Sequence, residues 1–345
     1  MMRREPDAPF TILILVAPHF NMAATMAFID PFRAVNYLTG RARFRWRLVS
    51  AAGGRCPASN GMAVETEALS DGALPDMAVV STSWSPEAAT GRGVLAALRR
   101  WARGGVTLAA LDTGAFVLAE AGLLQGRRAT VHYEHIDAFG EMYPETEISE
   151  ELFVFDGPRV TCAGGVAAGD VALNILRGLE GDARANAAAR YVFHGAVRPP
   201  GSSQNAGATE PLGLTAPGHV RRAIAVMEQH LEQPLSVAAI CAAAGISHRQ
   251  LDRLFADHVG CTPAAYYRDI RLDRARGLVT QTELALGEVA LACGFQSAVH
   301  FSRAYKARFG LTPSRDRIEG RVPFEFRAWP MHSVANLDKS AADSA

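Results

Sequence analysis

The sequence has few cysteines, almost no lysine and no long uninterrupted apolar run. Its five cysteines are scattered and form no Cys-x-x-Cys pair, which excludes a disulfide framework and a cysteine zinc site. We therefore expect a reducing compartment, the cytoplasm, with no bound metal and no cofactor. No apolar run reaches the ~20 residues that a membrane helix needs, so we expect no membrane partner.

The first apolar run, Phe10–Ala17, is the segment most easily mistaken for a leader. Arg3 and Arg4 precede it, as in a weak signal peptide, but Glu5 and Asp7 interrupt the basic segment. The run is rich in β-branched residues and is short, which favours a buried first strand over a leader.

The charge of the chain is balanced, with 35 basic and 35 acidic residues. Taken as evenly spread, zero net charge argues against a nucleic-acid partner. The charge is not even, because residues 218–320 carry 13 Arg and Lys against 10 Asp and Glu. This segment has a net charge of +3 and the rest of the chain −3, the asymmetry expected if the second part meets DNA.

Apolar segments of strand length alternate with helical patterns over the first half of the chain. The expected strands are Phe10–Ala17, Arg45–Ala51, Met77–Ser81, Thr107–Leu111 and Arg159–Cys162. The expected helices are Ala23–Leu38, Gly91–Gly104, Gly114–Ala121 and Gly169–Leu179. This alternation predicts an α/β domain with a largely parallel sheet, whose ligands bind at the carboxyl ends of the strands.

The composition changes near residue 195 and divides the chain into four parts. We expect an α/β domain at residues 10–194 and a flexible linker at 195–218, where proline, glycine and serine are concentrated. An all-α domain is expected at residues 219–320. A polar tail follows at 321–345, and we expect its last residues, from about Val334, to be disordered.

The all-α domain contains an internal repeat. The segments Ile240–Pro263 and Val289–Pro313 share the same punctuation, with Gly245 and Gly294 standing 49 residues apart. Each copy reads as a short apolar helix, a glycine turn, and an amphipathic helix that ends at glycine and a Thr-Pro pair. The pattern predicts two helix-turn-helix units in tandem.

A helix-turn-helix places its second helix in the major groove of DNA. In the first unit we expect Ser247 to cap this helix, and the outward residues are His248, Arg249, Gln250, Asp252 and Arg253. In the second unit Ser297 is the expected cap, and the outward residues are Ala298, Val299, His300, Arg303 and Lys306. Arginine reads guanine and small apolar groups meet the thymine methyl. The alternative is a helical protein-interaction module with solvated arginines.

The run from Val220 to Arg317 resembles an AraC-family DNA-binding domain, and the string GFQSAVHFSRAYKARFGLTPSRDR carries the most specific part of the likeness. The resemblance implies a joining helix at Ala264–Thr280 and a transcription regulator that binds asymmetric or direct-repeat sites in double-stranded DNA. It implies these base-facing residues: Arg249, Asp252, Arg253, Ala298, Val299, His300 and Arg303. We further expect a homodimer, RNA polymerase as a partner, and activation of transcription.

A second motif lies in the α/β half, at Leu111–Tyr133. It reads as a strand, a tight turn at Asp112–Gly114, a helix, and a short strand that ends at His132. With its A-G-L-L-x-G-R-R-A-T-x-H run, and with Cys162–Asp170, it resembles the PfpI-like, class I glutamine amidotransferase-like fold over roughly residues 10–180. The resemblance implies a flavodoxin-like parallel-sheet sandwich ahead of the tandem helix-turn-helix domain.

Enzymes of that superfamily carry a cysteine nucleophile at the turn, activated by a histidine like His132. This chain has Asp112 there, and the thiolate that amide hydrolysis needs is absent from the turn. We therefore expect a sensor with no catalytic residues. The alternative is an amidohydrolase or glyoxalase-like enzyme fused to a DNA-binding module.

We expect the carboxylate of Asp112 to be held by the amides of Gly114 and Ala115 at the helix N-terminus and to offer its charge to a pocket. Aromatic residues near the strand ends would add walls suited to a cationic metabolite. The expected ligand-binding residues are Asp112, Thr113, Gly114, His132, Tyr133, Trp84 and Phe20. The Asp-Thr-Gly turn resembles that of regulators of glycine betaine, carnitine and arginine catabolism, which implies a cationic, amino-acid-like or quaternary-ammonium effector.

Three structural alternatives stay open at these positions. Asp112 caps the helix and pairs with His132, Trp84 belongs to a core or a dimer contact, and His132 is a structural residue at a strand end.

Overall fold

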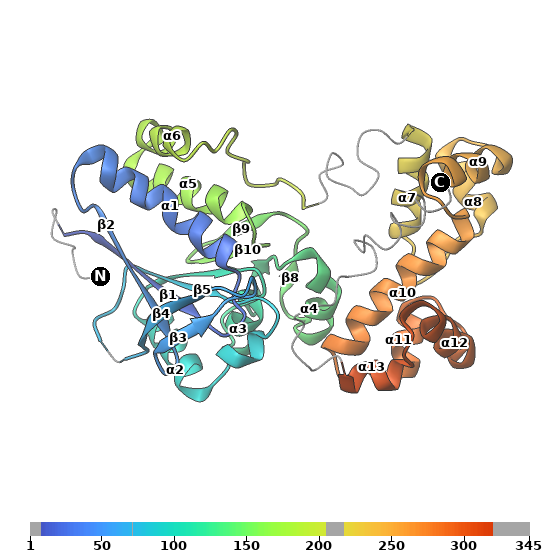
Figure 1. Cartoon of the computed structure of the whole chain (residues 1–345), viewed down its shortest axis with the longest axis horizontal. Helices are drawn as coiled ribbons and strands as arrows, with labels where there is room; N and C mark the ends of the chain where they lie inside the picture. Colours follow the sequence, from blue (N-terminus) through green and yellow to red (C-terminus); the bar gives the residue numbers. More distant parts are fainter. Residues whose placement is uncertain (1–7, 71, 205–216, 320–345) are drawn as a thin grey trace. The chain divides into compact units, whose positions relative to one another are not determined.

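The computed structural model describes residues 8–70, 72–204 and 217–319. The chain folds into two compact units, residues 1–204 and 205–345, and each is described by itself (Figure 1). The tail expected at residues 321–345 and the linker residues 205–216 lie outside the described residues. In the described parts, no helix has both the length and the apolar character needed to cross a membrane.

The first unit is built on one large twisted sheet, with strand order β3-β4-β2-β1-β5-β6-β10-β9. The strands are β1 (Phe10–Val16), β2 (Phe44–Ser50), β3 (Gly54–Pro57), β4 (Ala63–Ala68), β5 (Met77–Ser81), β6 (Thr107–Leu111), β9 (Phe153–Asp156) and β10 (Arg159–Cys162). The six central strands, β4 to β10 in sheet order, are parallel, and the edge strands β3 and β9 are antiparallel. The predicted parallel α/β sheet is therefore confirmed.

Helices cover both faces of this sheet, because alternate side chains of the central strands are apolar in both directions. On β5, Met77 and Val79 join a core with α1 (Met22–Thr39), α5 (Ala167–Glu180) and α6 (Asp182–Tyr191). Ala78 and Val80 join a second core. The helices of that face are α2 (Arg92–Arg103), α3 (Gly114–Glu120) and α4 (Ile136–Met142).

Several short elements were not predicted. Strand β3 lies at an edge, β4 lies next to it, and both are largely polar and accessible to solvent, so they lack the apolar signal of the buried strands. The pair β7 (Arg128–Ala129) and β8 (Glu147–Ile148) is two residues long, and the 3-10 helices η1 (Pro86–Ala89) and η2 (Tyr133–His135) are equally brief. The strand expected to end at His132 ends at Ala129 instead, since His132 caps η2.

Residues 195–204 of the expected linker are held against the first unit. The buried carboxylate of Asp170, on α5, accepts hydrogen bonds from the backbone and the guanidinium of Arg198 at 2.9 and 2.7 Å, and contacts His194 at 2.7 Å. Ser203 then forms an antiparallel bridge with Glu151. The prediction of a flexible linker from residue 195 is wrong for this stretch, because buried polar partners order it despite its composition.

The described part of the second unit, residues 217–319, has helices as its regular elements and two small cores that share one helix (Figure 1). Its helices are α7 (Gly218–Glu228), α8 (Val237–Ala244), α9 (His248–His258), α10 (Pro263–Gln281), α11 (Leu286–Ala292), α12 (Ala298–Phe309) and α13 (Pro313–Glu319). Helix α10, predicted at Ala264–Thr280, gives Tyr267 and Ile270 to the first core and Leu272 and Leu278 to the second. The tandem helix-turn-helix architecture, α8–α9 and α11–α12, is confirmed.

Candidate functional site

The first candidate site is the turn between β6 and α3, where Asp112 adopts a φ of 60°. Left-handed backbone is uncommon outside glycine and marks a position held by its surroundings. Two glycines allow the chain to approach closely: a Cβ on Gly114 would lie 2.4 Å from the carbonyl oxygen of Val80, and one on Gly164 would lie 2.9 Å from the Cβ of Asp112. The predicted tight turn is present.

Asp112 is almost fully buried, with 4% of its surface exposed, and has polar partners other than those expected. The amide of Asn21 donates to its carboxylate at 2.7 Å, and the hydroxyl of Ser83 and the N–H of Thr113 also donate to it. The expected donors, the amides of Gly114 and Ala115, are not among these partners. Burial raises the pKa of Asp112 above its usual value, against the effect of these donors.

Thr113 and Gly114, both predicted to bind ligand, are buried parts of the scaffold. The hydroxyl of Thr113 donates to the carbonyl of Ser83 at 2.5 Å and bonds the hydroxyl of Thr82 at 2.8 Å. These bonds join the turn after β6 to the segment after β5. The two residues therefore set the backbone of the turn and present no open surface.

A cluster of ionisable side chains, His132, Glu134 and His135, lies beside Asp112. One ligand atom from each residue lies within 4.8 Å of the others. The electrostatic effect of His135 lowers the pKa of Asp112, whereas Glu134 approaches His132 at 3.9 Å. Burial and the charge of Asp112 together raise the pKa of Glu134 to about 7. Two carboxyl groups with raised pKa values thus lie in a poorly solvated region together with two histidines.

Two of the three predicted aromatic residues are accessible. Trp84 and Tyr133 are each 40% exposed, and each stacks on a histidine: Trp84 on His19 at 6.4 Å and Tyr133 on His132 at 4.5 Å between ring centroids. The exposure of Trp84 contradicts the alternative of a core residue. Phe20 has no exposed surface and lies in a hydrophobic core, so it cannot form a wall open to a ligand.

Four polar residues at this site were missed by the sequence reasoning: Asn21, Ser83, Glu134 and His135. Asn21 and Ser83 follow β1 and β5 within a few residues, and the carboxyl ends of parallel strands meet at one edge. That position was a usable signal. Glu134 and His135 were hidden because the strand was extended too far, to His132.

Cys162, on the strand next to the turn, is not a substitute nucleophile. Its side chain is fully buried, and burial raises the pKa of the thiol to about 12. Its sulfur accepts a hydrogen bond from Gly164 at 3.4 Å. The thiol therefore stays protonated at neutral pH, which fits a structural cysteine.

The second candidate site is a pair of recognition helices, α9 and α12. The oxygen of Ser247 accepts from the N–H of Gln250, and the side chain of Gln250 bonds back to Ser247, which completes a capping box. Ser297 caps α12 by accepting from the N–H of His300. Both predicted caps are confirmed.

The outward faces of both helices carry the predicted side chains. The exposed ones are His248, Arg249, Arg253, Ala298, Val299, His300, Arg303 and Lys306. Asp252 is half-buried and lies 3.2 Å from the ring of His248. Val299 is 66% exposed on a helix whose Phe301 and Tyr305 are buried. An exposed apolar side chain among arginines matches the chemistry of a DNA-reading helix.

Ion pairs with little exposure hold α12 on α10. The guanidinium of Arg308 donates to both carboxylate oxygens of Asp273 at 2.9 and 2.8 Å and also reaches Asp269. Buried Asp316 accepts from Tyr305 at 2.8 Å and from Arg276 at 2.8 Å. The orientation of α12 is thus fixed through side chains that face away from the predicted DNA surface.

Comparison with known proteins gives the same two parts. Residues 11–178 match the DJ-1/PfpI family, and residues 240–318 match a helix-turn-helix domain. The HTH-type transcriptional regulator CdhR of Pseudomonas aeruginosa is 41% identical, over 88% of this chain and 90% of that protein. GlxA of Rhizobium meliloti, another HTH-type transcriptional regulator, is 35% identical over 87% and 93%.

Solved structures agree with this assignment. The superposition with an AraC family transcriptional regulator from Pseudomonas putida covers 53% of this chain and all of that structure. The sequence identity is 26% and the TM-score 0.50. A ThiJ/PfpI family protein from Pseudomonas syringae covers 71% of this chain, and 98% of its own, with 22% identity and a TM-score of 0.51, which supports the fold. The chain belongs to the AraC family of helix-turn-helix transcriptional regulators and carries a DJ-1/PfpI domain ahead of its DNA-binding domain.

Proposed function

We propose that a small cationic metabolite, amino-acid-like or a quaternary ammonium compound, binds at the Asp112 turn and controls this regulator. The observation that carries the proposal is the placement of two carboxyl groups, Asp112 and Glu134, in a poorly solvated region where the charge of Asp112 raises the pKa of Glu134. A bound cation relieves this repulsion. The exposed rings of Trp84 and Tyr133 add cation–π partners of the kind that quaternary ammonium groups prefer.

Glu134 takes over part of the role first given to Asp112. The side chain of Glu134 is 21% exposed, whereas Asp112 is 4% exposed. Glu134 is therefore the carboxyl group that a ligand reaches more directly, and Asp112 is the more buried of the two. The predicted residues Thr113 and Gly114 shape the turn without touching the effector.

Transmission to the DNA-binding unit starts at the segment around Gln204. The amide of Gln204 donates to the carbonyl of Val131 at 2.9 Å and to the hydroxyl of Thr130 at 3.0 Å. Val131 directly precedes His132. A shift of the 130–135 segment on effector binding therefore changes the anchorage of the chain that leads to the second unit.

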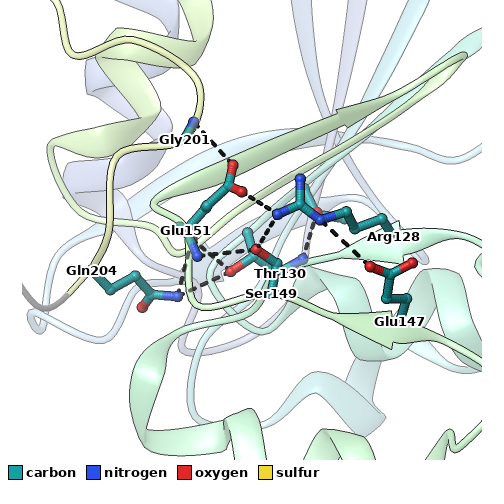
Figure 2. A network of polar contacts seen from close by, with 8 residues as sticks. Arg128, Thr130, Glu147, Ser149, Glu151, Gly201 and Gln204 are labelled. Atoms are coloured by element: carbon teal, nitrogen blue, oxygen red, sulfur yellow. Dashed lines mark hydrogen bonds and ion pairs between the residues drawn. The ribbon is translucent and has the colours of Figure 1, made fainter.

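A neighbouring polar network strengthens this anchorage (Figure 2). The carboxylate of Glu151 accepts from the N–H of Gly201 at 3.0 Å and pairs with Arg128. The carbonyl of Glu151 also accepts from Gln204 at 3.2 Å. Residues 201–204 are thus tied to the strands that flank the effector site, and a ligand alters their position only through its different affinity for two arrangements.

We further propose that the protein activates transcription and acts as a homodimer together with RNA polymerase. The first unit has no enzymatic role in this proposal. Asp112 in place of a cysteine and the protonated thiol of Cys162 support a sensing role. The relatives support it as well, since those compared are named as transcriptional regulators.

In-vitro transcription tests the coupling. DNA sites would first be selected from a random pool with the full-length protein, and transcription from a selected site measured with glycine betaine, carnitine or arginine. We expect one of these effectors to raise transcription. The variant Gln204→Glu places a carboxylate against three oxygen acceptors and so breaks the anchorage of residue 204. It should keep DNA and effector binding but lose the rise in transcription on effector addition. A response equal to that of the wild type would contradict the proposed transmission.

A further inference from the structure

The His132–Glu134–His135 cluster offers a set of donor atoms that suits a metal ion. Two imidazoles and a carboxylate are ligands that Zn²⁺ and neighbouring divalent metals bind. The three side chains are half-buried and come from one short stretch, at and just within η2. We propose that His132, Glu134 and His135 bind a divalent transition-metal ion of the Zn²⁺ type.

The distances allow this with small side-chain movements. The three ligand atoms lie within 4.8 Å of one another, and Nδ1 of His132 lies 3.9 Å from a carboxylate oxygen of Glu134. Around a tetrahedral zinc ion, with bonds of ~2.1 Å, ligand atoms stand roughly 3.4 Å apart. Closing the remaining gap needs rotations of half-buried side chains at a one-turn helix. They release Nδ1 of His132 from the N–H of Glu134, 3.4 Å away, and turn the ring of His135 against its neighbour Phe116.

The protonation chemistry of the ligands also suits a divalent cation. Glu134 binds a metal as the carboxylate, and the two histidines bind it in their neutral form, so metal binding releases protons. Asp112 is held in place by Asn21 at 2.7 Å and acts on His135 electrostatically.

Three protein ligands leave a coordination position open. Water can fill it, and so can the carboxylate of an amino-acid-like effector. Metal binding can be measured without effector and without DNA. The test of the metal site therefore does not depend on the proposed function. If the metal-free protein still binds a cationic effector, the proposed function is supported, and the metal proposal is judged by the zinc titration alone.

Zinc titration against a chromophoric chelator tests the site, on full-length protein first dialysed against EDTA. We expect one tight site in the wild type, weakened tenfold or more by Glu134→Gln and by His135→Asn. His258→Asn, on the exposed end of α9, is the matched control and should leave the affinity unchanged. Thermal unfolding of each metal-free variant, followed by circular dichroism, confirms that the fold is intact.

Two results would overturn the proposal. One is the absence of a tight stoichiometric site in the wild type. The other is equal zinc affinity in Glu134→Gln, His135→Asn and the wild type, which would assign the binding to other histidines.

Discussion

Asn21 joins the start of α1 to the Asp112 turn through the two ends of one side-chain amide. Its nitrogen donates to Asp112 at 2.7 Å, and its oxygen caps α1 by accepting from the N–H of Ala24 at 3.0 Å. The start of α1, which follows β1, and the turn after β6 are thereby tied together, so the buried carboxyl of Asp112 has a fixed position.

Replacement of Asn21 separates these two roles. Asn21→Ala removes the cap and a donor to a buried acceptor, so we expect the free energy of unfolding to fall by about 2 kcal/mol. Asn21→Ser keeps a capping oxygen and should lose about half as much. Urea denaturation of the first unit, followed by circular dichroism, measures both. Equal stability of Asn21→Ala and the wild type would show that neither bond stabilises the fold.

Arg308 should matter for folding of the second unit. Arg308→Met leaves the nearly buried Asp273 without its bidentate partner, and breaking such a pair costs about 3–5 kcal/mol. We expect the urea transition of the second unit to move to lower denaturant, with DNA affinity falling as the fold is lost. A transition at the wild-type midpoint would mean that solvent replaces Arg308 without cost.

Arg303 is the matched contrast, because it is exposed on the same helix. Arg303→Ala should change the unfolding free energy by less than about 0.5 kcal/mol. It should weaken binding to selected DNA by about 1–3 kcal/mol for a lost base contact and leave random DNA less affected. Fluorescence anisotropy on both DNAs measures the difference. An equal loss on the two would identify a phosphate contact.

Thiol titration tests the protonation of Cys162. With a pKa of about 12, the thiol remains protonated at pH 8, so it should react with Ellman's reagent only after unfolding. Cys261 is partly exposed, whereas the other four cysteines are buried, and we expect it to react first in the native protein. Rapid modification of Cys162 in the folded state, located by peptide mass spectrometry, would contradict its assignment as a structural residue.

The sequence predicts the elements whose residues are buried on both sides. The bounds of β5, β6 and β10 agree with the predicted ones, because continuous apolar runs of that length fit a central parallel strand. The repeat with its glycine and Thr-Pro punctuation predicts α8 to α12, since caps and turns depend on local chemistry. Edge strands such as β3 lack both signals, so no local pattern reveals them.

The candidate effector site was only partly predictable. Strand ends indicate where Asp112 lies, but they do not show which side chains turn inward, so Phe20 was assigned to the site although it belongs to the core. Glu134 and His135 depend on a 3-10 turn that has no strong sequence signature. The docking of residues 195–204 depends on buried Asp170, a long-range contact that composition cannot show.

Isothermal titration calorimetry of the full-length protein with glycine betaine, carnitine and arginine tests the central claim most directly, when the wild type is compared with Asp112→Asn. Asparagine tolerates the left-handed backbone of this position and removes the carboxylate with almost no change in size. We predict that one of the three compounds binds the wild type and binds Asp112→Asn at least tenfold more weakly, a loss of about 1.4 kcal/mol or more. Equal affinity of the two proteins, or no binding to the wild type, would contradict the account.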